Sequence, residues 1–156
     1  MDTNRWAVAS VAVAVVVAVV EMVIHGALLQ ETYQQTATVW RPMSESRSIM
    51  PLMWLGYAIF APFFVYIYAK GLEPGKPPLE QGMRFGIIFG TGLSAMNSLI
   101  WYVVLPIPVA LAWAWFIAGI VVFLAAGVAA GLTYKPEGPA RAQPDKKAAK
   151  KRRGRR

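Results

Sequence analysis

Glu21 and His25, two residues that can exchange protons, stand four positions apart in an otherwise apolar stretch. Residues at this spacing share one face of a helix, so the carboxylate and the imidazole can pair. An ionisable group inside a bilayer costs about 2.5 to 3.5 kcal/mol on insertion scales, which makes it a functional candidate. The pair therefore indicates a proton-carrying carboxylate, half of an ion site, or a polar clamp. The alternative is that Glu21, protonated or paired, only fixes how the helices pack.

Two further polar residues could reach this carboxylate. A rise of 1.5 Å per residue places Glu21 about 23 Å from the inner boundary of a bilayer and Asn97 at about 20 Å. Trp40-Arg41-Pro42 could fold back as a lid with Arg41 on Glu21, or it could anchor the outer segment at the membrane interface. We expect a candidate intramembrane polar site made of Glu21, His25, Asn97 and Arg41.

A stripe of small residues recurs at every fourth position further along the chain. It comprises Gly82, Gly86, Gly90, Ser94 and Ser98. Small residues at this spacing let a neighbouring backbone approach closely. The stripe predicts packing within the chain, for which Gly119, Gly127 and Gly131 offer a partner surface, or self-association of two copies.

Four membrane-spanning helices are needed to position these residues. Of the 156 residues, 56% are hydrophobic and only 15% are charged. A bilayer core of about 30 Å takes about 20 helical residues, and four apolar tracts reach that length. We predict an all-α, four-transmembrane-helix bundle within residues 1–136. Its spans cover about residues 6–28, 50–70, 82–104 and 109–133.

Three local features refine these spans. The first tract could be a secretory signal, but its apolar run is long and Glu21 and His25 stand where small cleavage-site residues are expected. Pro51 is expected in the first turn of the second span, where proline is tolerated. The string Leu105-Pro106-Ile107-Pro108 fits only a tight hairpin, so the third and fourth spans must be antiparallel neighbours.

The basic residues predict the orientation. Arg41 and Arg47 fall on one side of the spans, and the rest of the 16 lysines and arginines fall on the other. Cytoplasmic segments are enriched in Lys and Arg. We therefore expect a multi-pass protein of a bacterial cell (inner) membrane with both the N and C termini in the cytoplasm.

Residues 137–156 form a polybasic tail that cannot bury enough apolar surface to fold alone, so we expect it to be disordered. Anionic headgroups of the inner leaflet attract such a segment by about 1 kcal/mol per basic residue. Nucleic acid or an acidic protein would feel the same field, but no aromatic residue is interleaved to stack bases, and specific nucleic-acid binding is not expected. The residues assigned to anionic lipid contact are Lys146, Lys147, Lys150, Lys151, Arg152, Arg153, Arg155 and Arg156.

The composition argues against most catalytic chemistry. The chain has no cysteine and one histidine, which excludes thiolate sites and an all-histidine metal cluster within one copy. We find no Gly-rich phosphate loop after a strand, no His-Glu metalloprotease helix and no nucleophile elbow. We expect no enzymatic activity, no metal and no cofactor.

Six short strings stand out between Glu21 and Pro136. They are His25-Gly26-Ala27-Leu28-Leu29, Trp40-Arg41-Pro42, Tyr68-Ala69-Lys70-Gly71, Glu80-Gln81-Gly82-Met83-Arg84-Phe85-Gly86, Pro106-Ile107-Pro108 and Tyr134-Lys135-Pro136. In these strings the chain resembles a family of small four-helix bacterial integral membrane proteins with no assigned activity. The resemblance covers most of the chain except the tail, implies the four-span topology and carries over no mechanism.

Two functions are compatible with these features. The first is a non-enzymatic accessory or scaffold subunit that acts by helix packing in the membrane, within a membrane protein complex or a homo-oligomer, with the basic tail at the inner surface. The second is a small oligomeric proton-coupled or ion-conducting transporter that uses Glu21, His25 and Asn97. A single buried carboxylate and the lack of a broken-helix pair favour the first.

Overall fold

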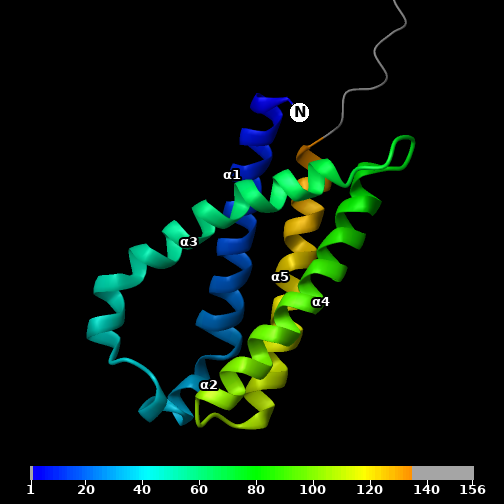
Figure 1. Ribbon diagram of the computed structural model, residues 1–156. Helices are drawn as coiled ribbons and strands as arrows, with labels where there is room; N and C mark the ends of the chain where they lie inside the picture. Colours follow the sequence, from blue (N-terminus) through cyan, green and yellow to red (C-terminus); the bar gives the residue numbers. More distant parts are fainter. Residues whose placement is uncertain (1, 135–156) are drawn as a thin grey trace, which may run out of the picture.

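The computed structural model describes residues 2–134, and all the regular elements among them are helices (Figure 1). This confirms the predicted all-α class, and four of these helices are long and apolar enough to cross a membrane. They are α1 with its π-helical extension (Thr3–Leu28), α3 (Met43–Lys70), α4 (Pro78–Val104) and α5 (Val109–Thr133). The basic tail, with the lipid contacts expected for Lys146 to Arg156, lies outside the described residues.

Short helical segments connect the first two spans. The α-helical part of α1, Thr3–Val23, continues directly into a π-helix, Ile24–Leu28. A short α2 (Gln30–Gln35) and a 3₁₀ turn (Ala37–Val39) follow. Figure 1 shows the start of α1, the loop between α3 and α4 and the end of α5 at one end of the bundle, which we call the termini end. The α2 segment and the α4–α5 hairpin lie at the opposite end.

The helices pack in the order α3, α1, α5, α4. Helix α5 packs most extensively against α4 and then against α1, whereas α3 packs mainly on α1 and touches α5 only slightly. Because the hairpin predicted at 105–108 joins α4 and α5, these two helices run antiparallel side by side (Figure 1).

The α4–α5 contact is a backbone-to-backbone one. Gly82, Gly86, Gly90, Ser94 and Ser98 are the small residues that α4 buries, and they face α5. A methyl group on Gly82 would overlap the carbonyl oxygen of Gly127, and a methyl group on Gly127 would overlap that of Gly82. The stripe is therefore occupied by α5 of the same chain. A second copy would reach it only if α4 and α5 separated.

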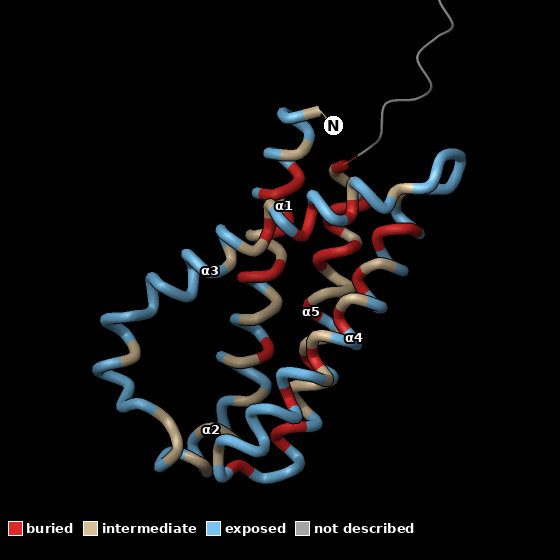
Figure 2. Tube along the Cα trace, viewed as in Figure 1, coloured by how far each residue is buried: buried red, intermediate tan, exposed pale blue. Residues whose placement is uncertain are grey.

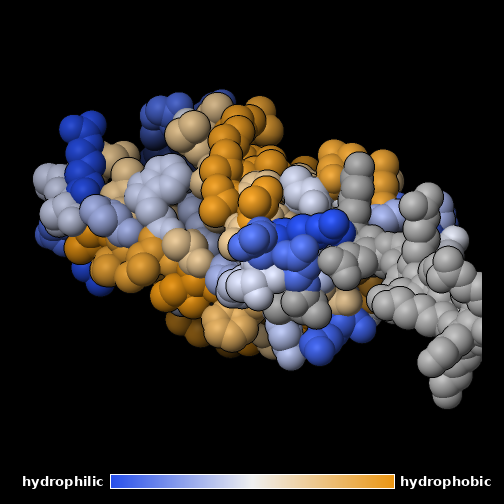
Figure 3. Space-filling view, turned by 90° about the horizontal axis from the view of Figure 1, so that it is seen from above, coloured by the Kyte–Doolittle hydropathy of each residue, from blue (hydrophilic) through white to orange (hydrophobic). Residues whose placement is uncertain are grey.

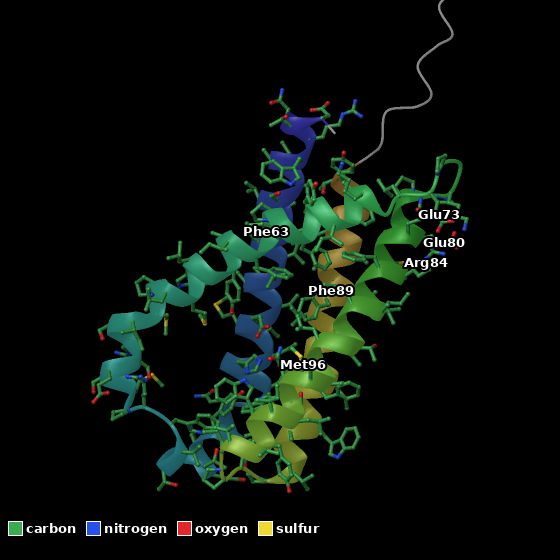
Figure 4. The ribbon with its side chains drawn as sticks, viewed as in Figure 1. Phe63, Glu73, Glu80, Arg84, Phe89 and Met96 are labelled. Atoms are coloured by element: carbon green, nitrogen blue, oxygen red, sulfur yellow. The ribbon has the colours of Figure 1, made fainter. Side chains whose placement is uncertain are left out.

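An aromatic cluster fills the bundle towards the termini end. Phe64 of α3 is fully buried, and its ring lies 4.8 Å from that of Phe85 and 5.6 Å from that of Phe89, both on α4. Phe123 of α5 contacts the same group. Figure 4 shows Phe89 on the side of α4 that faces the other helices. This cluster joins the second half of α3 to α4 and α5.

The first half of α3 diverges from the bundle. Its buried residues are Ala61, Phe64, Val65 and Tyr68, all in the second half, where the carbonyl of Pro62 also accepts a hydrogen bond from the Trp6 indole at 3.0 Å. Residues 43–56 are exposed apart from the half-buried Ser46. Figure 2 shows this stretch in pale blue along nearly its whole length, away from α1.

Pro51 does not begin this helix, contrary to our expectation. Helix α3 begins at Met43 and contains both Pro51 and Pro62. The carbonyl of Pro42 accepts hydrogen bonds from the backbone N–H groups of Glu45 and Ser46, so Pro42 caps the helix. The polar residues that follow Pro42 suit a first turn near the membrane surface. Proline at position 51 is tolerated because the carbonyl that it leaves unpaired belongs to exposed Arg47.

The loop between α3 and α4 is held by one buried amide. The side-chain oxygen of Gln81 accepts the N–H of Glu73 at 2.7 Å, and its nitrogen donates to the carbonyls of Glu73 and Lys76 at 3.2 and 3.0 Å. The Glu73 carboxylate pairs with Lys76 and with Arg84, which together hold the pKa of Glu73 below its usual value. Figure 4 shows Glu73 and Arg84 close together at this loop.

The surface of the molecule matches a membrane environment at its flanks. Figure 3 views the bundle from the termini end, where broad hydrophobic areas alternate with hydrophilic patches. Large apolar side chains are exposed on each of the long helices; for example, Val11, Phe63, Leu99 and Ile117 are more than half exposed. Such surface is expected where lipid surrounds the helices.

Candidate intramembrane polar site

Glu21 and His25 meet near the end of α1. The imidazole Nε2 lies 3.0 Å from the carboxylate Oε2, and the side chains of Glu21 and His25 are 27% and 37% exposed. The two residues are one helical turn apart, so the contact needs no change in the path of the helix. The site is therefore partly shielded by protein and opens to the surroundings on one side.

His25 lies in the π-helical turn Ile24–Leu28 rather than in regular α-helix. The wider turn is closed by a hydrogen bond from the N–H of Leu29 to the carbonyl of Ile24 at 2.8 Å. Single π-helical turns occur frequently at functional sites, because the extra residue per turn re-aims the side chains. Here the π-helical turn ends α1 and leads the chain into α2. The side chain of Tyr33 in α2 contacts His25.

Tyr33 is the third member of the site. Its hydroxyl lies 2.5 Å from Nδ1 of His25, and the two rings stack with their centroids 5.9 Å apart. The same hydroxyl accepts a hydrogen bond from Nε1 of Trp115 on α5, at 2.8 Å. The network therefore runs from α5 through α2 to α1.

Trp40 covers the Tyr33 end of this network. Its ring stands edge-on to those of Tyr33 and Trp115, at centroid distances of 5.4 and 6.0 Å. Its indole N–H donates to the Thr36 hydroxyl at 2.9 Å. Trp40 therefore packs on Tyr33 and Trp115, and the lid and anchor roles considered for Trp40-Arg41-Pro42 stay predictions. Arg41 is exposed and makes no ion pair with Glu21 among residues 2–134.

The donors and acceptors of the network fix its protons. Trp115 N–H can only donate, so Tyr33 oxygen accepts from it. The Tyr33 hydroxyl hydrogen then has an acceptor only if Nδ1 of His25 carries no proton. The imidazole proton is therefore on Nε2, where it donates to the Glu21 carboxylate. We assign a neutral His25 with its proton on Nε2 from this count, because a proton on Nδ1 leaves the Tyr33 hydrogen without an acceptor among residues 2–134.

The Tyr33 phenol is held in its protonated form. Burial raises its pKa above the usual 10.0, the Trp115 hydrogen bond lowers it by a smaller amount, and the nearby Glu21 charge raises it further. Tyr33 therefore keeps its hydroxyl proton throughout the neutral range, and the hydroxyl donates a hydrogen bond to Nδ1 of His25. The chain of hydrogen bonds from Trp115 to Glu21 keeps a single direction.

Asn97 is not brought to this network. It lies on the exposed side of α4, and its side chain makes no hydrogen bond among residues 2–134. Helix α4 packs on α5, which stands between α4 and α1 in the packing order. The sequence places Glu21 and Asn97 at similar depths in the bilayer. Depth alone does not determine which side of its helix a residue occupies, so equal depth does not imply contact.

Tyr33 and Trp115 were not recognised from the sequence. They are separated by 82 positions, and neither is part of a periodic pattern. The available signal was weaker, namely two amphipathic aromatic residues near the same membrane boundary as Glu21, each of which needs a polar partner when buried.

Replacement of Tyr33 tests the network. In Tyr33→Phe, the indole of Trp115 and Nδ1 of His25 lose their common partner, and we expect the free energy of unfolding to fall by about 1 to 2 kcal/mol. Chemical denaturation in detergent measures this change. Tyr66→Phe is the control, since Tyr66 is exposed and its hydroxyl makes no hydrogen bond among residues 2–134. Equal stability of the two variants would contradict the network.

Comparisons of this chain with protein-family models, with curated protein sequences and with solved structures find no match. The resemblance noted from the short strings therefore stays a prediction, and function has to be argued from the geometry of the chain itself.

Proposed function

We propose that this chain is a non-enzymatic integral membrane protein that serves as an accessory or scaffold subunit through helix packing. The observation that carries this proposal is the asymmetry of the bundle. Helices α4 and α5 pack with their backbones in direct contact. In contrast, the first half of α3 is exposed around almost its whole circumference. Such a half-helix offers a surface to another membrane protein or to a second copy of the chain.

The polar network supports a structural role within this proposal. It connects three elements that are distant in sequence: α1 through Glu21 and His25, α2 through Tyr33, and α5 through Trp115. In a low-dielectric environment, connected hydrogen bonds of this kind fix one arrangement of the helices. A clamp at the end of the bundle opposite the termini holds α1 on α5 while α3 stays available.

The orientation belongs to the same proposal. The excess of basic residues near the termini end supports a bacterial cell membrane with both termini in the cytoplasm. The tail residues Lys146 to Arg156 would then contact anionic headgroups of the inner leaflet. A tag placed after Arg156 that reacts with a reagent unable to enter intact cells would contradict this orientation.

Extraction in native lipid tests the scaffold proposal. We expect the mass of the extracted particle to exceed that of one chain, through another subunit or further copies, and Glu21→Gln to leave that mass unchanged. Native mass spectrometry of polymer-extracted lipid particles makes the measurement. A lone monomer under all extraction conditions would refute the proposal.

A second function, proton-coupled or ion-conducting transport, is favoured by one specific observation. The hydrogen-bond chain Tyr33–His25–Glu21 is continuous, with distances of 2.5 and 3.0 Å, and it contains an imidazole and a carboxyl group, both of which can carry a proton. Under this function, Glu21→Gln abolishes a pH-dependent flux into proteoliposomes while the protein still folds. No flux for any member of a panel of ions and small solutes would eliminate it.

A further inference from the structure

An apolar groove lies between α1 and the diverging part of α3. Its volume is about 280 Å³. Residues of α1 form one wall and residues of α3 form the other. The main lining residues are Ala14, Ala18 and Met22 of α1 and Trp54, Tyr57 and Ala58 of α3. The groove exists because the two helices are joined at the termini end and separate towards the opposite end.

Two aromatic rings form the α3 wall. Trp54 and Tyr57 stand edge-to-face, with ring centroids 6.0 Å apart and an interplanar angle of 85°. The faces of such rings carry negative electrostatic potential and attract organic cations. On the opposite wall, the small side chains of Ala14 and Ala18 leave room beside the rings.

Glu21 lies on the face of α1 beside the groove. It stands three positions after Ala18 and directly before Met22, both of which line the groove, and residues three apart in a helix are neighbours on one face. Only Oε2 of its carboxylate is paired, with His25. Oε1 accepts no hydrogen bond among residues 2–134, and the side chain is 27% exposed.

The charge of this site is not balanced by protein. With the neutral imidazole that the hydrogen-bond count assigns, an ionised Glu21 gives the Glu21–His25 pair a net charge of −1. Among residues 2–134, neither Arg41 nor any other Arg or Lys pairs with the Glu21 carboxylate. An uncompensated carboxylate at membrane depth is costly, and a cation that can enter the apolar region reduces that cost.

We propose that the α1–α3 groove binds a monovalent organic cation with an apolar body, its body between Ala18 and Trp54 and its charge beside Oε1 of Glu21. This goes beyond the proposed scaffold function, since a single chain carries every residue of the site. The ligand class follows from three properties together: an apolar groove of small-molecule size, an aromatic wall, and an unpaired carboxylate oxygen.

Calorimetric titration of the detergent-purified full chain with tetraphenylphosphonium tests this site. The neutral analogue triphenylphosphine oxide serves as the matched probe, because its aromatic body is similar and it carries no net charge. We expect saturable binding of the cation and binding at least 10-fold weaker of the neutral analogue. Equal affinity for the two would overturn the proposal, because an apolar groove without the carboxylate would give that result.

Three variants test the geometry of the same site. Glu21→Gln is expected to weaken cation binding at least 10-fold, whereas Glu21→Asp keeps the charge and retains binding within a few-fold. Ala18→Phe fills the groove and is expected to abolish binding, and Leu99→Phe on the exposed face of α4 is its control. Wild-type affinity in Glu21→Gln or in Ala18→Phe would overturn the proposal.

These results are independent of the oligomeric state. The titration measures cation binding to the purified chain, and the extraction in native lipid measures assembly. Binding can therefore fail while the chain still assembles, and assembly can fail while the chain still binds the cation. Circular dichroism and the elution volume of each variant establish that it is folded before its affinity is compared. A Glu21→Asp variant that is folded but does not bind, alongside a binding Glu21→Gln variant, would also count against the carboxylate's role.

Discussion

Gly86→Ala is expected to lower the free energy of unfolding by about 2 kcal/mol, whereas Gly92→Ala is expected to leave it unchanged or raise it slightly. The two residues lie on the same helix, six positions apart. A methyl group on Gly86 would overlap the carbonyl oxygen of Phe123 and would lie 3.0 Å from the Cα of Leu124. At Gly92 it would meet nothing within 4 Å.

The physical reason lies in what must move. At Gly86 the obstructing atoms belong to the backbone of α5, so a methyl group can be accommodated only if α4 and α5 separate along their length. That separation loses the close contacts at Gly82 and Gly90 as well, because they belong to the same stripe. At Gly92 the added methyl faces the surroundings, and alanine has the better helix propensity.

Reversible unfolding in mixed micelles, followed by circular dichroism, measures both variants. Gly127→Ala is the reciprocal test, because its methyl group would overlap the carbonyl of Gly82 from the other side, and a loss of similar size is expected. If Gly86→Ala and Gly92→Ala had the same stability, α4 and α5 could not be in backbone contact.

Gln81→Ala is the second change with a large expected effect, a loss of about 2 to 3 kcal/mol. The amide of Gln81 is 5% exposed and makes three hydrogen bonds to the backbone of residues 73 and 76. An intramolecular hydrogen bond contributes about 1 kcal/mol net, and more is lost when buried partners are left unsatisfied. The alanine variant removes all three and leaves a small void between the loop and α4.

The loop should respond locally as well as globally. Without the amide, the polar side-chain contacts that still hold the loop are the Glu73 ion pairs and, across its two ends, the hydrogen bond from the Tyr68 hydroxyl to the carbonyl of Pro78, at 2.7 Å. We expect faster amide hydrogen exchange at Glu73 and Lys76 and a lower unfolding temperature. Glu80→Ala is the matched control, since its exposed carboxylate makes no hydrogen bond among residues 2–134. A Gln81→Ala variant as stable as Glu80→Ala would show that the loop does not depend on this amide.

Much of the architecture is visible in the order of residues. Four apolar tracts give four long helices, and the short proline-containing string at 105–108 makes α4 and α5 antiparallel neighbours. The five small residues from Gly82 to Ser98 are all buried on one side of α4. Each of these features is local or periodic, so the sequence expresses it directly.

The site could be predicted only in part. The spacing of Glu21 and His25 places them on one helical face, and they lie 3.0 Å apart. Tyr33 and Trp115 come from other elements, and their approach depends on the π-helical turn at Ile24–Leu28 and on how α5 packs against α1. No pattern within the sequence encodes that approach.

The sequence alone therefore determined features that belong to single segments. These are the number of long apolar helices, the stripe of small residues on α4 and the pairing of Glu21 with His25. The tertiary structure decided the rest, namely that α3 diverges from α1, that Asn97 lies on the exposed side of α4, and that Tyr33 links His25 to Trp115. The reason is that helix period and apolar length are properties of each segment by itself. The direction in which one helix crosses another depends on side chains from both, here the aromatic cluster around Phe64 that holds only one half of α3.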